Sequence, residues 1–123
     1  MKKFFAALLC VAAITLVGCK SDPLATGTRA DKLTAEQIEK MDNKTEKCWH
    51  IAIRVTVNGQ TETSDGYEWG TEQEIAAACK ITYEAAVAAW KISGVDGKYE
   101  IAYSPSSAKD MDSCLAQNKD DDK

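Results

Sequence analysis

The residues of this chain with the widest chemical repertoire are five cysteines and a single histidine. Cys48, His50, Cys79 and Cys114 together have the donor set of a Cys₃His zinc site. Cys48 with His50 also has the composition of a thiol nucleophile and its base. The spacing is not that of a zinc knuckle, however, and no carboxylate motif accompanies the pair to orient the histidine. We therefore expect no catalytic residue, no metal site and no cofactor.

The N-terminal segment has the pattern of an export signal. Met1 to Lys3 is basic, and Phe4 to Gly18 is an uncharged, mostly apolar run. These are the n-region and h-region of a secretory signal peptide. A membrane-spanning helix needs about 20 apolar residues, which is more than this run provides. We expect residues 1–18 to be a signal peptide and not a permanent transmembrane helix.

Leu16-Val17-Gly18-Cys19, at the end of the apolar run, resembles the lipobox of bacterial lipoproteins. The resemblance implies that the Cys19 thiol receives diacylglycerol, that lipoprotein signal peptidase cleaves before this residue, and that the new amine is acylated with a chain such as palmitate. Two or more acyl chains anchor a protein stably to a membrane. Lys20 stands where an aspartate retains some of these lipoproteins in the inner membrane. The resemblance thus implies a lipid anchor in the outer membrane, facing the periplasm or the cell surface.

The resemblance covers the first nineteen residues, and no family is identified for residues 20–123. Removal of residues 1–18 takes away two of the 15 basic residues and none of the 19 acidic ones, so the formal charge falls from −4 to −6. This sign disfavours nucleic acid as a partner. The remaining length suits one small domain with a modest core.

Composition divides the exported chain into three parts. Residues 19–33 contain Pro23 and Gly27 and have no sustained periodicity, which indicates a flexible tether behind the lipidated cysteine. We expect residues 34–117 to form a single globular domain. Residues 118–123 are polar, end Lys-Asp-Asp-Asp-Lys, and read as an acidic tail.

Local patterns divide residues 34–69 into a helix and two strands. Thr34 to Gln37 is a capping box and predicts a helix that continues to about Glu46. Apolar and polar residues alternate over 48–57, which indicates a half-buried strand. Asn58-Gly59 is a hairpin-turn sequence. We therefore expect a second, more polar strand over 61–69.

A second capping box, Thr71 to Glu74, begins an amphipathic helix of about five turns. Its apolar stripe consists of Ile75, Ala78, Cys79, Thr82, Ala86, Ala89 and Trp90. Gly94 ends this helix, and alternation predicts a strand over 98–104.

After Pro105, Ser107 is expected to cap a last helix that continues to about Gln117, with Met111 and Leu115 facing inward. The order of elements is then α-β-β-α-β-α. This order predicts an α+β domain with a small, mainly antiparallel sheet of about three strands and with helices packed on one face.

An exported compartment is oxidising, so the three cysteines of the domain should form one disulfide and leave one thiol. Cys79 lies within the apolar stripe of the long helix, and Cys114 lies beside the Met111 and Leu115 stripe. We therefore favour a Cys79–Cys114 disulfide, with Cys48 as the alternative partner of Cys114.

Seven large aromatic residues, three tryptophans and four tyrosines, occur in the domain, and the phases of most of them fit a core. Tyr67 and Trp69 are the exception, because they precede a helix N-terminus beside a glycine-rich stretch, and we consider them possible binding residues. The expected function is a non-catalytic binding module for an envelope protein, peptide or glycan. The alternatives are an inhibitor or immunity-type protein for an exported enzyme, and a small thiol or hydrolytic enzyme.

Overall fold

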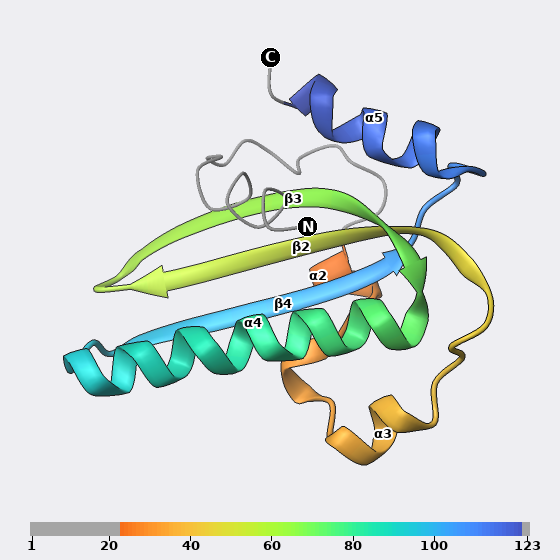
Figure 1. The fold of residues 1–123 in the computed structure, drawn as a ribbon. Coiled ribbons are helices and arrows are strands. Elements are labelled where there is room, and N and C mark those ends of the chain that lie inside the picture. The colour runs from red at the N-terminus through yellow and green to blue at the C-terminus, as the bar shows by residue number, and fades with distance from the viewer. Residues whose placement is uncertain (1–22, 122–123) are drawn as a thin grey trace.

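A computed structural model of the chain describes residues 23–121 (Figure 1). The predicted signal peptide, residues 1–18, and Cys19 lie outside the described residues, and so do residues 20–22, 122 and 123. The elements of the described part follow in the order α2 (Pro23–Thr26), β1 (Thr28–Arg29), the 3₁₀ turn η1 (Ala30–Lys32), α3 (Ala35–Glu39), β2 (Glu46–Val57), β3 (Gln60–Thr71), α4 (Glu72–Ser93), β4 (Gly97–Pro105) and α5 (Met111–Asp121).

The strands form one antiparallel sheet in the order β1-β4-β2-β3, with helices packed against it, so the predicted α+β class is confirmed. Asn58 and Gly59 both have positive φ, 54° and 80°, as expected for a tight hairpin turn. This two-residue turn fixes the register of β2 against β3, which places His50 opposite Tyr67. The fourth strand, β1, was not predicted and has two residues.

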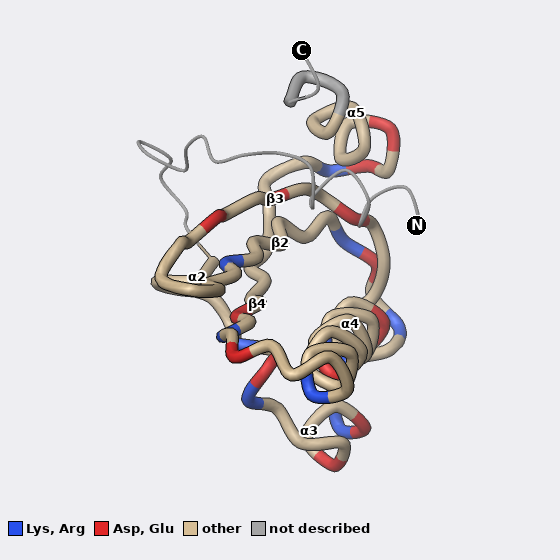
Figure 2. Tube along the Cα trace, turned by 90° about the vertical axis from the view of Figure 1, so that its left-hand side faces the viewer, with Lys and Arg blue, Asp and Glu red and all other residues tan. Residues whose placement is uncertain are grey.

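The core lies between one face of the sheet and α4 (Figure 2). Thr71 and Glu74 form both hydrogen bonds of the predicted capping box, and Gly94 ends the helix with φ of 75°. Alternate residues of β2 and β4 point toward α4. The largest members of this core are Trp49, Ile51, Ile53, Ile75, Tyr99, Ile101 and Tyr103.

The opposite face of the sheet is covered in part by α2 and α5, whereas helices were expected on one face (Figures 1 and 2). Cys48 points away from the core residue Trp49 that follows it, and a disulfide joins Cys48 to Cys114 of α5. This covalent bond holds α5 against β2 and β3 on the face opposite α4. No helix among residues 23–121 is both long and apolar enough to cross a bilayer.

Residues 23–33, expected to belong to a flexible tether, are part of the folded domain. Pro23 is buried, and its carbonyl accepts a hydrogen bond from the amide of Gly27 at 2.8 Å. Thr28 and Arg29 then pair with β4. A Cβ at Gly27 would overlap the carbonyl groups of Tyr103 and Pro23, so only glycine permits this close packing.

Two predicted helix boundaries are wrong. The capping box at Thr34 forms, but α3 ends at Glu39 and not near Glu46. The carboxylate of Asp42 accepts hydrogen bonds from the amides of Lys44 and Thr45, which turns the chain out of the helix.

The last helix begins after Asp110, not at Ser107, because the Asp110 carboxylate accepts the amide of Ser113 at 2.8 Å. The helix continues to Asp121, into the predicted acidic tail. Met111 and Leu115 are 50% and 38% exposed, whereas Cys114 is fully buried. The disulfide therefore determines which side of α5 faces the sheet.

Candidate functional site

Tyr67 and Trp69 lie within β3, on the face opposite α4, and not on an open loop. The Tyr67 ring stacks on His50 with 4.6 Å between ring centroids and 9° between planes. The Tyr67 amide donates to Oδ1 of Asn118 at 2.8 Å, and the Tyr67 carbonyl accepts from Nδ2 of Asn118 at 2.9 Å. Trp69 is half-buried, and its indole nitrogen donates to Glu46 at 3.4 Å. Tyr67 thus helps to hold α5 on the sheet.

His50 lies in a buried polar cluster, not at the rim of the domain. It is 3% exposed, and its Nε2 lies 2.7 Å from Oδ2 of Asp65. Sequence reasoning missed this carboxylate. The contact could have been predicted from the register of the hairpin. A two-residue turn at Asn58 and Gly59 places Asp65 diagonally across from His50 on the same face.

Ser104 of β4 lies opposite His50 in the register, so a serine, a histidine and an aspartate lie on neighbouring strands. The Ser104 Oγ is buried and has no hydrogen-bond partner within residues 23–121. A nucleophilic serine needs a hydrogen bond to its base and access to substrate. The cluster as built provides neither.

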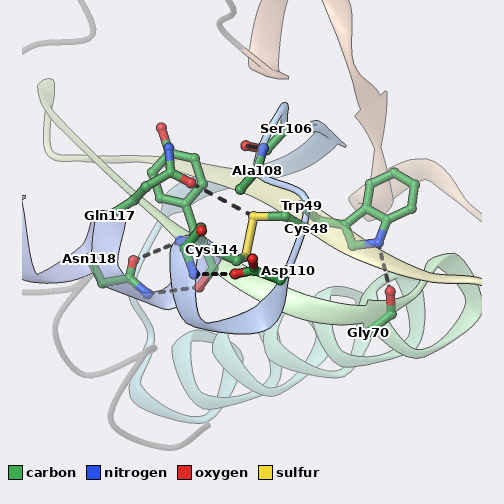
Figure 3. Close-up of a disulfide and its surroundings, with 11 residues drawn as sticks. Cys48, Trp49, Gly70, Ser106, Ala108, Asp110, Cys114, Gln117 and Asn118 are labelled. Atoms are coloured by element: carbon green, nitrogen blue, oxygen red, sulfur yellow. Dashed lines mark hydrogen bonds between the residues drawn. A yellow bond between two sulfur atoms is a disulfide. The ribbon is translucent and has the colours of Figure 1, made fainter.

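The disulfide joins Cys48 to Cys114, the alternative pairing, and the favoured pairing of Cys79 with Cys114 is wrong (Figure 3). Cys48 and Cys114 meet with their Cα atoms 5.5 Å apart. Cys79 faces the sheet from α4, so it lies on the other side of the sheet and stays a buried free thiol. Burial, together with the charge of Glu68, raises the pKa of this thiol to about 12. The four residues of the considered Cys₃His set are therefore divided between two faces.

A cleft of about 430 Å³ lies beside the outer edge of β4, within the size range typical of ligand pockets. Its three sides come from the segment after α2, from α4 and from β4 itself. Its lining residues are Arg29, Asp31, Lys32, Tyr83, Val87, Gly97, Lys98, Tyr99 and Glu100.

The wall on the α4 side is apolar and aromatic. Tyr83 and Val87 are one helical turn apart and therefore lie on the same side of α4. The Tyr83 ring lies 6.1 Å from that of Tyr99, which is buried in the floor of the cleft. Lys80 lies over the Tyr83 ring at 5.3 Å, and its Nζ donates to the carbonyl of Asp31 at 3.2 Å. These contacts connect α4 to the opposite wall of the cleft.

Two carboxylates beneath the cleft are each matched by arginine. Arg29 makes a bidentate contact with Asp31, at 2.9 and 2.8 Å. Arg54 makes a second bidentate contact with Glu100, at 2.7 and 3.1 Å. The hydrogen bond from Arg54 holds the pKa of Glu100 below its usual range, and this carboxylate stays ionised at neutral pH.

Two lysines of the cleft add positive charge beyond that of the two arginine–carboxylate pairs. Lys98 is 71% exposed and lies 3.9 Å from Glu100, and Lys32 is exposed at the rim. With both arginines already matched by carboxylates, the two lysines give the cleft a positive surface. The chain as a whole is acidic, with a formal net charge of −4, so the cleft has the sign opposite to that of the chain.

Sequence reasoning missed this cleft, because one of its walls belongs to residues 29–32, which composition assigned to the tether. The ion pairs give no local signal, since Arg54 and Glu100 are 46 residues apart in sequence. Among residues 23–121, no group of three or more histidine, cysteine or acidic side chains is placed to hold a metal ion. The chain matches no protein-family model, no curated protein and no solved structure, so the geometry of the site carries the functional argument.

Proposed function

We propose that this protein is an outer-membrane lipoprotein, anchored through Cys19, whose domain binds an envelope partner without catalysing a reaction. The observation that carries the proposal is the positive, partly aromatic cleft beside the outer edge of β4. A concave site with a few convergent polar groups is the usual location of ligand binding.

The state of the cysteines and of Ser104 favours binding over catalysis. Cys48 and Cys114 are consumed in a disulfide, and the remaining thiol of Cys79 is buried with a raised pKa. A reactive thiol requires the opposite conditions, exposure and a lowered pKa. The Ser104 hydroxyl is also buried. These observations support a binding module over the thiol and hydrolytic alternatives.

The lipid anchor would hold the cleft close to the membrane. Three residues separate Cys19 from Pro23, and Pro23 is already buried in the domain. The distance from the Cα of Cys19 to that of Pro23 is then at most about 14 Å. Arg29, which lines the cleft, follows α2 by three residues. A partner at this cleft is therefore expected to be present at the membrane surface.

Substitution of Cys19 tests the anchor. In Cys19→Ala we expect loss of acyl label, together with accumulation of the unprocessed precursor or release of protein into soluble fractions. Fractionation after labelling with a radioactive fatty acid measures both effects. Unchanged processing and membrane retention would falsify the lipoprotein assignment.

Charge reversal tests the cleft. We expect Lys32→Glu/Lys98→Glu to capture at least ten times less of a specific partner from envelope extract than the wild-type lipoprotein, with an unchanged melting temperature. Lys109→Glu is the matched control, because Lys109 is exposed and lies outside the cleft. Equal capture by the double variant and by the control would show that the cleft is not the binding site.

A further inference from the structure

We infer that the ligand of the cleft is a short extended peptide segment, with acidic residues alternating with apolar ones, that adds to the outer edge of β4. The inference rests on the proposed binding function and names the chemistry of the partner. Strand addition is a recurring mode of peptide recognition in which the backbone of the peptide pairs with an exposed sheet edge.

The backbone of β4 supplies the first part of the argument. β1 pairs with β4 at Ala102 and Tyr103, and the amide of Ile101 donates to Oδ1 of Asp31 at 3.2 Å. Within residues 23–121, no strand continues this pairing along Gly97–Glu100. Because hydrogen-bonding directions alternate along a strand, the amide and carbonyl of Tyr99 point to the same side as the amide of Ile101. They face the cleft and match the donor and acceptor of an extended peptide.

The two walls of the cleft supply the sequence preference. Successive side chains of an added strand point to opposite faces of the sheet. On the α4 side they would meet Tyr83 and Val87, which favour an apolar residue. On the other side they would meet the exposed Lys98, which favours a carboxylate. The expected ligand therefore alternates apolar and acidic residues.

The charges on the β4 side agree with an acidic ligand. Glu100 is approached by Arg29 at 3.4 Å, by Arg54 at 2.7 Å and by Lys98 at 3.9 Å, so several cations already offset its charge. Asp31 is engaged by Arg29 and by the amide of Ile101. A basic peptide would meet Lys32 and Lys98 and be repelled. The open length Gly97–Glu100 limits the pairing to a short segment.

The test uses the lipidated protein in detergent micelles and three blocked synthetic peptides. One peptide alternates valine and glutamate, the second alternates valine and lysine, and the third is the glutamate peptide with methylated amides on its pairing edge. We expect the glutamate peptide to bind at least ten times more tightly than either of the other two. It should also slow hydrogen exchange of the Tyr99 amide, measured by NMR.

Lys98→Glu should reverse the charge preference, so that the lysine peptide binds more tightly than the glutamate peptide. Equal binding of the methylated and unmethylated peptides would overturn strand addition. Absence of binding by the glutamate peptide would also overturn the inference. Failure of the proposed function would be a separate result: Lys32→Glu/Lys98→Glu would capture as much envelope partner as the wild type. A third outcome is that the double variant loses envelope capture but methylated and unmethylated peptides bind equally. This outcome would support the cleft as the binding site and would reject strand addition.

Discussion

At one edge of the sheet β3 lies against α5 (Figures 1 and 2). At the other edge β4, beyond its short pairing with β1, borders a cleft. Asn118 bonds to both the amide and the carbonyl of Tyr67, so its side-chain amide takes the place of a neighbouring strand. The disulfide between Cys48 and Cys114 holds the helix that carries Asn118. On β4, the comparable groups of Tyr99 face the cleft.

The two edges of the sheet are protected in different ways. An exposed strand edge invites pairing with other chains, and proteins usually cover or charge it. β3 is the longer edge, with twelve residues, and Asn118 of α5 caps its backbone at Tyr67. The cleft edge of β4 is short and is flanked by Lys98 and Arg29. A short, charged edge limits unspecific pairing while it stays available to a matching ligand.

The largest effect is expected from removal of the disulfide. Cys48→Ala/Cys114→Ala should lower the free energy of unfolding by about 4 kcal/mol, because the bond closes a loop over a sequence separation of 66. Denaturant titration of oxidised wild type and variant measures this difference. The variant should also exchange the Tyr67 amide faster, since α5 would no longer be held on β3.

Exchange at Ile101 in the same variant is the internal control. Its amide is bonded to Asp31 at the other edge of the sheet, away from α5. If Ile101 and Tyr67 lost protection equally, the disulfide would stabilise the whole domain without a special role at the β3 edge.

A smaller effect is expected from Asn118→Ala. The substitution removes two hydrogen bonds to the Tyr67 backbone and should cost about 1–2 kcal/mol. Gln117→Ala is the matched control, because Gln117 is the neighbouring amide on α5 and its contact with the Cys48 sulfur is long, at 3.8 Å. Equal destabilisation by both variants, measured by denaturant titration, would contradict the edge-capping role of Asn118.

The two edge strands also carry glutamates whose pKa values shift in opposite directions. Burial raises the pKa of Glu68 on β3, whereas the hydrogen bond from Arg54 lowers the pKa of Glu100 on β4. Stability from Glu100 is present above pH 4.5 and is lost as the pH falls below it. Protonated Glu68 favours folding, and this contribution is lost as the pH rises above 4.5 toward the raised pKa.

Melting temperatures between pH 3 and 8 should separate these two contributions. Glu100→Gln is expected to weaken the loss of stability on the acidic side. Glu68→Gln is expected to raise stability at neutral pH relative to wild type, because the neutral amide removes a charge that burial disfavours. Parallel pH profiles for wild type and both variants would show that neither glutamate controls the pH dependence.

Regular elements with strong local signals could be predicted from the sequence. Alternation over 48–57, the Asn58-Gly59 turn and the Thr71 capping box each encode their structure within a few residues, and each is present. Residues 23–33 were misassigned because α2, β1 and η1 are too short to show periodicity. Their positions depend on distant partners, such as the Asp31 carboxylate that accepts the amide of Ile101.

The site was less predictable than the fold. The cysteine pairing required the orientation of α5, and the Met111 and Leu115 stripe pointed to the wrong side of this helix. The cleft forms where β1 and the charged residues that follow it lie beside the edge of β4. No local sequence pattern encodes this arrangement. The binding role of Tyr67 and Trp69 stays a prediction. The contacts of Tyr67 with His50 and Asn118 also give this residue a structural role.

The smallest effect on folding is expected at the open edge itself. Lys98→Ala should change the free energy of unfolding by no more than about 0.5 kcal/mol, because Lys98 is 71% exposed and its contact with Glu100 spans 3.9 Å. Arg54 continues to neutralise Glu100 in this variant. Because Lys98 lines the cleft and supplies part of its positive charge, we nevertheless expect Lys98→Ala to reduce partner capture several-fold. Denaturant titration and envelope capture on the same preparation measure both quantities. A loss of stability comparable to that of Asn118→Ala would mean that the β4 edge, like the β3 edge, is built to stabilise the fold.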